Sequence, residues 1–320
     1  MTALQTNQEP PPLEPVKGVS MWQDARRRLL KDRVAVACFV VVALYALVAL
    51  AAWAGTWIND LHAAGTVGDG AKRLADSFLF ADYAKQDQNV ANQAPSAAHL
   101  AGTDLLGRDV LARIANGAGI ALKLGFAVGA IAVLVGAFFG AIAGWFGKVV
   151  DEFVTWLYTT VSSIPDIMLM MAIAFVLGRG FRSMLIAMAC TYWVGVARIV
   201  RAEFIKLRDR DYVLAAKALG LTNTRIMLVH VAPNVAHLLI VLFSLLFVEA
   251  IKAEVILSFL GVGIVNEPSW GILIADAETE LMRGLWWQIT FTSVALFGIV
   301  LALQVFGDAL RDALDPRLRQ

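Results

Sequence analysis

Two long runs without a single charged side chain limit what this chain can fold into. They cover residues 34–54 (VAVACFVVVALYALVALAAWA) and 124–146 (LGFAVGAIAVLVGAFFGAIAGWF). Each run is long enough to cross a hydrocarbon layer of about 30 Å as an α-helix. Apolar residues make up 59% of the chain and charged residues only 17%, which argues against a water-soluble domain. The sequence therefore predicts an all-α integral membrane protein.

Four further apolar runs bring the predicted number of transmembrane helices to six. They cover residues 153–178, 184–200, 235–263 and 285–307. Pro165 lies inside the third of these runs and predicts a kink there. In the run 124–146, five glycines recur at the spacing of a helix face, which indicates a helix that a partner backbone approaches closely: Gly125, Gly129, Gly136, Gly140 and Gly144.

Lysine and arginine predict the orientation, because cytoplasmic segments of membrane proteins are enriched in both. Basic residues gather before residue 34, between residues 198 and 225, and after residue 307, so both termini are expected in the cytoplasm. Trp53 and Trp57 then fall where an outer aromatic belt is expected.

This orientation divides the chain into predicted segments. Residues 20–33 read as an amphipathic interfacial helix that Ser20 caps, with a merely basic flank as the alternative. The remaining segments are a disordered cytoplasmic tail at 1–19, the first transmembrane helix at 34–57, an extracytoplasmic loop at 58–117, a core of five transmembrane helices at 118–307, and a cytoplasmic C-terminal tail at 308–320.

Several kinds of site find no support in the sequence. The net charge is +1 and the basic residues form no stripe with aromatics, so nucleic acid is not an expected partner. Cys38 and Cys190 lie in apolar runs and read as packing residues, and the four histidines lack metal-ligand spacing. The phosphate-binding pattern GxxxxGK[ST] is absent, since Lys148 is followed by Val149. We therefore expect no metal, no cofactor and no ATP site in this chain.

The largest predicted cytoplasmic feature is the segment 201–234, which contains DYVLAAKALGLTNTRIMLVHVAPN at 211–234. Its composition predicts a helix, a left-handed turn at Gly220, and a second helix that Thr222 caps and Pro233 ends. The adjacent small residues Ala215 and Ala216 would let another protein approach closely. On the second helix, Ile226 and Val229 would offer an apolar contact. This segment is typical of a docking element.

Four charged residues interrupt the apolar runs: Asp166, Glu249, Lys252 and Glu254. A charge in hydrocarbon is costly, so each should face protein or water. Glu249 and Lys252 are three residues apart and can pair on one helix face. The four residues either line a substrate path or form structural ion pairs and boundary positions, and the sequence leaves both readings open.

The segment 211–234 resembles the cytoplasmic coupling motif of bacterial ATP-binding-cassette importer permeases. The motif begins with Glu-Ala-Ala, and Leu214 stands here where the glutamate would be. The resemblance implies that the following residues contact an ATPase: Asp211, Leu214, Ala215, Ala216, Gly220, Ile226, Pro233 and Asn234.

Five other stretches resemble the C-type permease subunit of oligopeptide and dipeptide importers, and the similarity covers nearly the whole chain from Ser20 onward. They are SMWQDARRRLLKDRVAV, AGTDLLGRDVLARI, ILSFLGVG, PSWGILI and GDALRDALDPR. The resemblance implies a type I importer permease fold in the bacterial inner membrane. It also implies four kinds of partner: a homologous second permease subunit, two cytoplasmic ATPases that bind ATP and Mg, an extracytoplasmic peptide-binding protein, and membrane lipid.

Similar permeases carry oligopeptides, dipeptides, nickel chelates or peptide antibiotics, so the substrate stays open. Two other classes of protein compete with this reading. An ion-coupled secondary transporter fits six spans with intramembrane carboxylates, but no paired broken segments indicate inverted repeats. A membrane-embedded enzyme lacks a nucleophile with a base at workable spacing. Dependence on an ATPase partner distinguishes the importer from the carrier.

Overall fold

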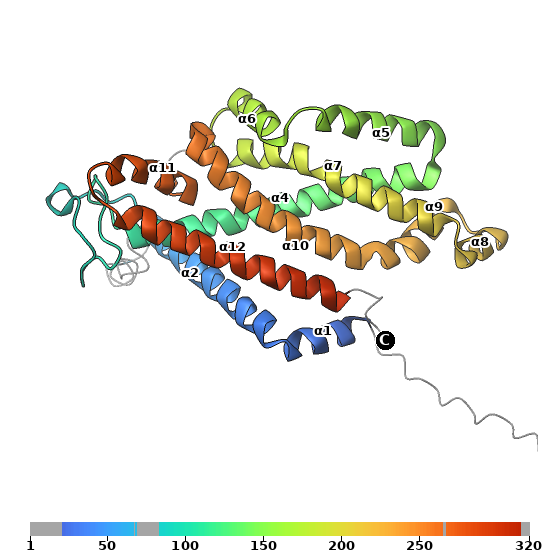
Figure 1. Cartoon of the computed structure of the whole chain (residues 1–320), viewed down its shortest axis with the longest axis horizontal. Helices are drawn as coiled ribbons and strands as arrows, with labels where there is room; N and C mark the ends of the chain where they lie inside the picture. Colours follow the sequence, from blue (N-terminus) through green and yellow to red (C-terminus); the bar gives the residue numbers. More distant parts are fainter. Residues whose placement is uncertain (1–20, 67, 69–82, 265–266, 315–320) are drawn as a thin grey trace, which may run out of the picture.

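The structure is a computed structural model, and it describes residues 21–66, 68, 83–264 and 267–314. Five long apolar helices meet the length and composition of a membrane span: α2 (Arg33–Ala63), α4 (Val110–Phe146), α7 (Phe181–Arg208), α10 (Ala232–Leu257, within a continuous helical stretch of 223–262) and α12 (Trp287–Leu314). They run alongside one another along the long axis of the molecule (Figure 1). An all-α membrane fold is confirmed for the described residues.

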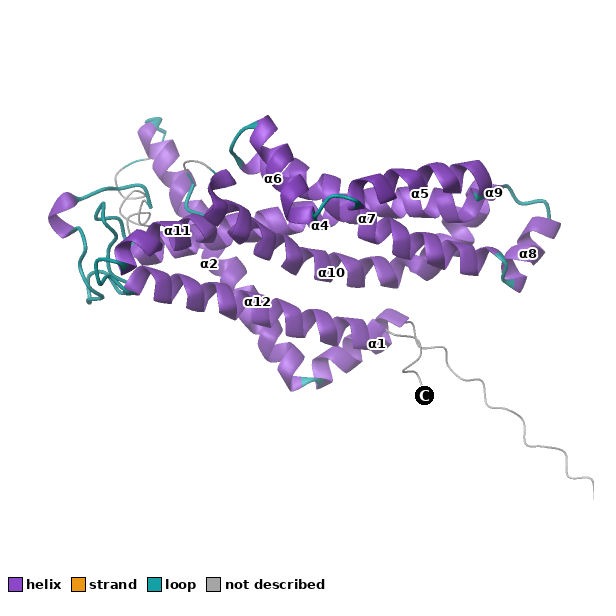
Figure 2. Ribbon diagram, turned by 45° about the horizontal axis from the view of Figure 1, so that its top comes forward, coloured by secondary structure: helices purple, strands orange, loops and turns teal. Residues whose placement is uncertain are grey.

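Shorter helices occupy the ends and one side of this bundle. A bent pair, α5 (Lys148–Ser162) and α6 (Asp166–Leu177), packs against α7, with α5 running along it and α6 set at an angle (Figures 1 and 2). The others are α1 (Met21–Lys31), η1 (Gln88–Val90), α8 (Asp211–Ala218), α9 (Asn223–Arg225), α11 (Trp270–Leu281), and the π-helical turns η2 (Ile226–Val231) and η3 (Ser258–Val262).

The centre of the bundle is α4, whose glycines let α7 and α10 approach it closely, while Leu124 and Val128 pack beside them in the core. A Cβ atom built on Gly136, Gly140 or Gly144 would lie 2.6 Å from a backbone oxygen of α7. Gly125 and Gly129 face α10 instead, at Phe247 and Phe243. The predicted close packing at these five glycines is confirmed, and it involves two neighbouring helices rather than one.

The third predicted span is not one straight helix. The segment 153–178 falls in α5 and α6, whose axes differ by 85° across the break at 163–165. Pro165 has no N–H to donate and disfavours helical backbone at the residue before it, which accounts for a break at this position. The bend is much larger than a kink, and the pair is either one broken span or a re-entrant hairpin.

Several helix boundaries in the structure differ from the predicted ones. Helix α4 begins at Val110 because the Asp109 side chain caps it by accepting from the Ala112 N–H at 2.9 Å, so the expected loop 58–117 is helical at both ends. Helix α12 continues to Leu314, well into the expected tail at 308–320. The expected tail at 1–19, the capping role of Ser20 and residues 315–320 lie outside the described residues.

Helix α1 lies within the predicted interfacial segment 20–33, and it is anchored to the bundle. Ala25 is buried in a cluster with Val241 of α10 and Leu314 of α12, while Leu30 is exposed. One side of α1 therefore contacts protein, and the other side is free for the membrane interface.

We predict that Gly140→Ala destabilises the protein, because the new methyl group would lie 2.6 Å from the Ala197 oxygen and 2.9 Å from the Val200 Cβ. Overpacking of this kind costs about 1–3 kcal/mol. The measurement is the thermal unfolding midpoint in detergent. The matched control is Gly195→Ala in α7, where a Cβ meets nothing within 4 Å. Equal midpoints for both variants would contradict the close α4–α7 contact.

Candidate functional site

The predicted docking segment lies at one end of the molecule. Figure 1 shows α8 and α9 at the end opposite α11 and the loop that precedes α4. The segment is built as predicted up to its second helix: α8 covers Asp211–Ala218, and a turn leads to α9 at Asn223.

Gly220 makes the turn after α8. Its φ of +78° is in the left-handed region, where glycine carries no steric penalty. The Gly220 N–H donates to the Lys217 oxygen at 2.9 Å, and the Leu221 N–H donates to the Ala216 oxygen at 3.2 Å. These bonds satisfy carbonyl groups at the end of α8, so the turn has a defined geometry.

The prediction that Pro233 ends the second helix is wrong. After α9 the chain passes through the π-helical turn η2 directly into α10, and Pro233 lies in the first turn of α10. The Ala232 N–H donates to the Met227 oxygen, five residues back. The first turn of a helix tolerates a residue without an N–H, so the helical path continues into the membrane. The docking segment is thereby joined rigidly to α10.

Two of the predicted contact residues face the interior of this chain. Ala216 and Ile226 are buried with Val213, and they pack in one cluster with Phe204 and Val235. Their burial in this cluster therefore holds α8 against α7, η2 and α10. A partner protein would meet other side chains, so the expectation that Ala216 and Ile226 provide the contact is corrected.

The outer surface of the segment carries large apolar side chains among charged and polar ones. We call its exposed residues with apolar or aromatic side chains the coupling surface: Tyr212, Leu214, Ala215, Leu219, Leu228 and Val229. Leu219, beside the Gly220 turn, is 82% exposed. The predicted contact residues Asp211 and Asn234 are also exposed, and the Asn234 side chain donates to the Tyr212 hydroxyl at 3.2 Å.

Polar contacts tie the base of the segment to the end of α4. The Lys217 ammonium lies 5.2 Å from the centre of the Trp145 ring, and Arg208 donates to the Gly144 oxygen at 3.3 Å. On α7, Arg201 forms an ion pair with Asp151 of α5. These contacts join the segment to the end of α4 and join α7 to α5.

The charged residues within the spans separate into two environments. Glu249 and Lys252 form the expected ion pair on α10, with about half of each side chain exposed. Asp166 is exposed at the first position of α6. Glu254, by contrast, is fully buried, and the Ser258 hydroxyl donates to its carboxylate at 2.6 Å.

Tyr192 of α7 lies beside Glu249, and sequence reasoning missed it. Its hydroxyl donates to the Glu249 backbone oxygen at 3.4 Å, which links α7 to α10. Helix α6, which begins at Asp166, also packs against α7. A phenol hydroxyl inside an apolar run was the available signal in the sequence.

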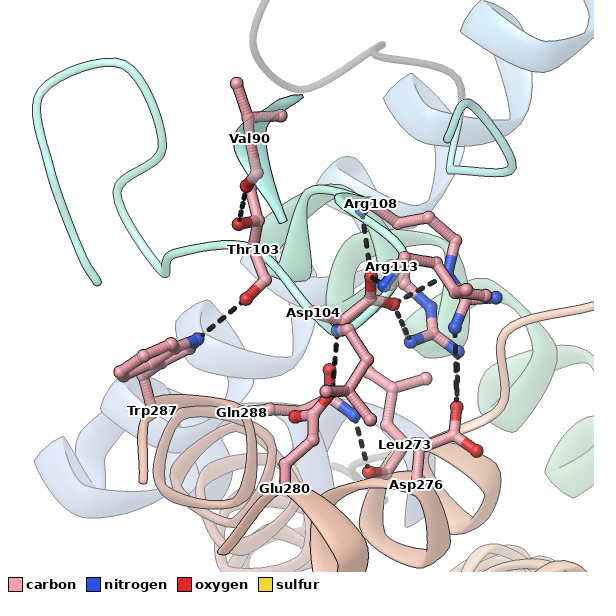
Figure 3. A network of polar contacts seen from close by, with 12 residues as sticks. Val90, Thr103, Asp104, Arg108, Arg113, Leu273, Asp276, Glu280, Trp287 and Gln288 are labelled. Carbon is pink, nitrogen blue, oxygen red and sulfur yellow. Dashed lines mark hydrogen bonds and ion pairs between the residues drawn. The ribbon is translucent and has the colours of Figure 1, made fainter. Parts of the chain in front are cut away.

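At the opposite end of the molecule, the motif GTDLLGRD forms a buried polar network (Figure 3). The Asp104 carboxylate accepts from the Leu106 and Arg108 N–H groups, both at 2.9 Å, and from the Arg108 and Arg113 side chains at 2.6 and 2.7 Å. Arg113 also donates to Asp276 of α11 at 3.0 Å. Since Asp104 and Arg113 are almost fully buried, this pairing locks the loop onto α4 and α11.

The same loop is fastened to α11 and α12. The Trp287 ring N–H donates to the Thr103 oxygen at 2.9 Å, and the Leu105 N–H donates to the Glu280 carboxyl at 3.1 Å (Figure 3). Burial raises the pKa of Glu280. Gly107 has a φ of +71°, and a Cβ there would lie 1.8 Å from the Asp87 oxygen, so only glycine fits.

Comparison with known proteins identifies the family. Residues 136–320, more than half of the chain, match the binding-protein-dependent transport system inner membrane component. Residues 20–66 match the N-terminal transmembrane domain of oligopeptide transport permease C.

Curated relatives match over almost the whole chain. The dipeptide transport system permease protein of Alkalihalophilus pseudofirmus is 31% identical, and the match covers 97% of this chain and 94% of the relative. The oligopeptide transport system permease protein of Bacillus subtilis is 31% identical over 95% of this chain and 92% of its own. A glutathione transport system permease protein of Pectobacterium atrosepticum is 30% identical over 93% and 92%.

These matches favour an importer permease over an ion-coupled carrier or a membrane enzyme, in agreement with the motifs in the sequence. The chain belongs to the inner membrane component family of binding-protein-dependent transport systems, as a non-catalytic, multi-pass permease subunit of the bacterial inner membrane.

Proposed function

We propose that this chain is one permease subunit of an ATP-driven importer of peptides or peptide-like solutes. Its relatives are named as dipeptide, oligopeptide and glutathione permeases, which supports this substrate class. A homologous second permease subunit completes the pathway, two cytoplasmic ATPases bind ATP and Mg, and an extracytoplasmic binding protein delivers the substrate. The membrane is crossed six times, with α5 and α6 as one broken span and both termini in the cytoplasm.

The coupling surface carries this proposal. An apolar surface at the end of a membrane protein, beyond its apolar runs, needs a protein to cover it. Leu214 replaces the glutamate of the family motif, so docking here relies on apolar shape rather than on an ion pair. Asp211 and Asn234 border the surface, and Gly220 and Pro233 set the backbone that presents it.

The proposed transmission is mechanical. Ala216 and Ile226 hold α8 rigidly against α7 and α10, and Lys217 links it to the end of α4. Closure of the ATPases would move the docked segment, and rigid contacts would carry the movement into the membrane helices. Coupling between two sites requires contacts that differ between two states, and a rigid element at a moving interface provides them.

The exposed surface around Tyr192 is the proposed lining of the peptide path. Glu249, Lys252 and Asp166 supply charges of both signs, which suits the ammonium and carboxylate ends of a peptide. Glu254 was expected in the path, but its burial and its bond with Ser258 suit a structural role, so we leave it out of the lining.

We predict that Leu219→Arg combined with Leu228→Arg lowers the amount of ATPase that co-purifies with the permease by about tenfold or more, because apolar anchors at the centre of an interface carry most of its binding energy. The measurement is co-purification in detergent, with membrane insertion followed separately. The control is Leu100→Arg, an exposed leucine at the opposite end. Unchanged co-purification with both double and control variants would reject the coupling surface.

We predict that Glu249→Gln combined with Lys252→Gln reduces peptide uptake while the complex still assembles. A half-exposed ion pair contributes about 1 kcal/mol or less to stability, so its loss should not prevent folding. Uptake into proteoliposomes and the elution volume of the complex are measured together. The control is Arg311→Gln with Asp312→Asn at the end of α12, where both residues are exposed. Normal uptake by the first variant would remove the pair from the path.

A further inference from the structure

A polar cavity of about 340 Å³ opens between α2 and α4, apart from the surfaces described above. Its polar lining comes from Trp53, Thr56 and Asn59 of α2, Tyr83 in the loop before α4, Asn116 and Lys123 of α4, and Glu267 before α11. An apolar groove of about 650 Å³, lined by residues such as Leu50, Leu122 and Phe126, adjoins it. Both spaces are lined by Ala49, Trp53, Gly119 and Lys123, so they lie on either side of the same residues.

The junction of the two spaces lies at the edge of the apolar run. Lys123 immediately precedes the uncharged residues 124–146, and its ammonium lies 5.9 Å from the centre of the Trp53 ring. Trp53 stacks on Trp57, with ring centres 6.4 Å apart. Tryptophans gather at the depth of lipid headgroups, so the groove lies beside the acyl chains and the polar cavity beside the headgroups.

The polar cavity is lined by side chains of opposite charge and by a hydrogen-bond acceptor. Lys123 makes no ion pair with any described residue, and it supplies a cation. Glu267 is exposed and supplies an anion. The Asn59 side-chain oxygen is buried and accepts no hydrogen bond from the described residues. A buried acceptor without a donor is costly, which indicates a ligand that brings one.

We propose that this site binds a phospholipid whose headgroup carries a primary amine. One acyl chain lies in the apolar groove, the phosphate contacts Lys123, and the headgroup ammonium donates to Glu267 and Asn59. A purely anionic lipid would satisfy Lys123 but would place negative charge beside Glu267. The bound lipid bridges α2 and α4, and it thereby fastens the N-terminal helix to the rest of the permease.

The test uses the purified importer complex, with delipidated protein titrated with phosphatidylethanolamine, phosphatidylglycerol or phosphatidylcholine and bound lipid counted by native mass spectrometry. We expect one site selective for phosphatidylethanolamine. Lys123→Gln should weaken binding of all three lipids by about tenfold, the scale of a charge-assisted hydrogen bond. Glu267→Gln should abolish the selectivity for the amine, and Ala46→Phe should block the groove without changing charge.

The control is Lys85→Gln, which removes an exposed cation that does not line the cavity. Phosphoethanolamine without acyl chains should not compete, because it leaves the groove empty. Unchanged affinity and selectivity in the Lys123, Glu267 and Ala46 variants would overturn the proposal. Displacement of the lipid by peptide substrate would also overturn it, since the cavity would then belong to the peptide path.

Discussion

The rest of the structure depends on the backbone contact between α4 and its neighbours. Helices in a lipid layer gain little from burying apolar side chains, because the lipid is equally apolar, so close packing has to supply the attraction. Gly136, Gly140 and Gly144 allow α4 to lie directly against α7, and Gly125 and Gly129 do the same for α10. Large side chains at these five positions would separate the three helices that carry both functional ends.

Helix α4 also joins those two ends physically. It spans 37 residues, which corresponds to about 55 Å. Its first turns hold the Asp104 network through Arg113, and its last turn contacts the docking segment through Trp145. In the proposed orientation, a rigid helix of this length would allow an event at the loop that precedes α4 and an event at the coupling surface to influence one another. The proposed lipid lies against the same helix, where it would stabilise the attachment of α2.

Prediction from sequence succeeded where a feature depends on residues that are close together in the chain. The left-handed turn at Gly220, the close packing of the α4 glycines and the Glu249–Lys252 pair all follow from neighbours within one helix or turn, and the structure has each of them. Pro233 misled because a π-helical turn just before it restored a continuous helix. Tyr192 was missed because its partner, Glu249, comes from another helix, 57 residues further along the chain.

The sequence by itself determined the membrane class, the family and the position of the segment that we propose as the docking element. These properties depend on consecutive residues, because an apolar run or a motif can be recognised without knowing which residues are neighbours in space. Only the tertiary structure decided that Ala216 and Ile226 face inward while Leu219 and Leu228 face outward, and that Glu254 is buried while Glu249 is exposed. The direction of a side chain depends on which helices pack around it, and that packing joins residues that are far apart in the chain.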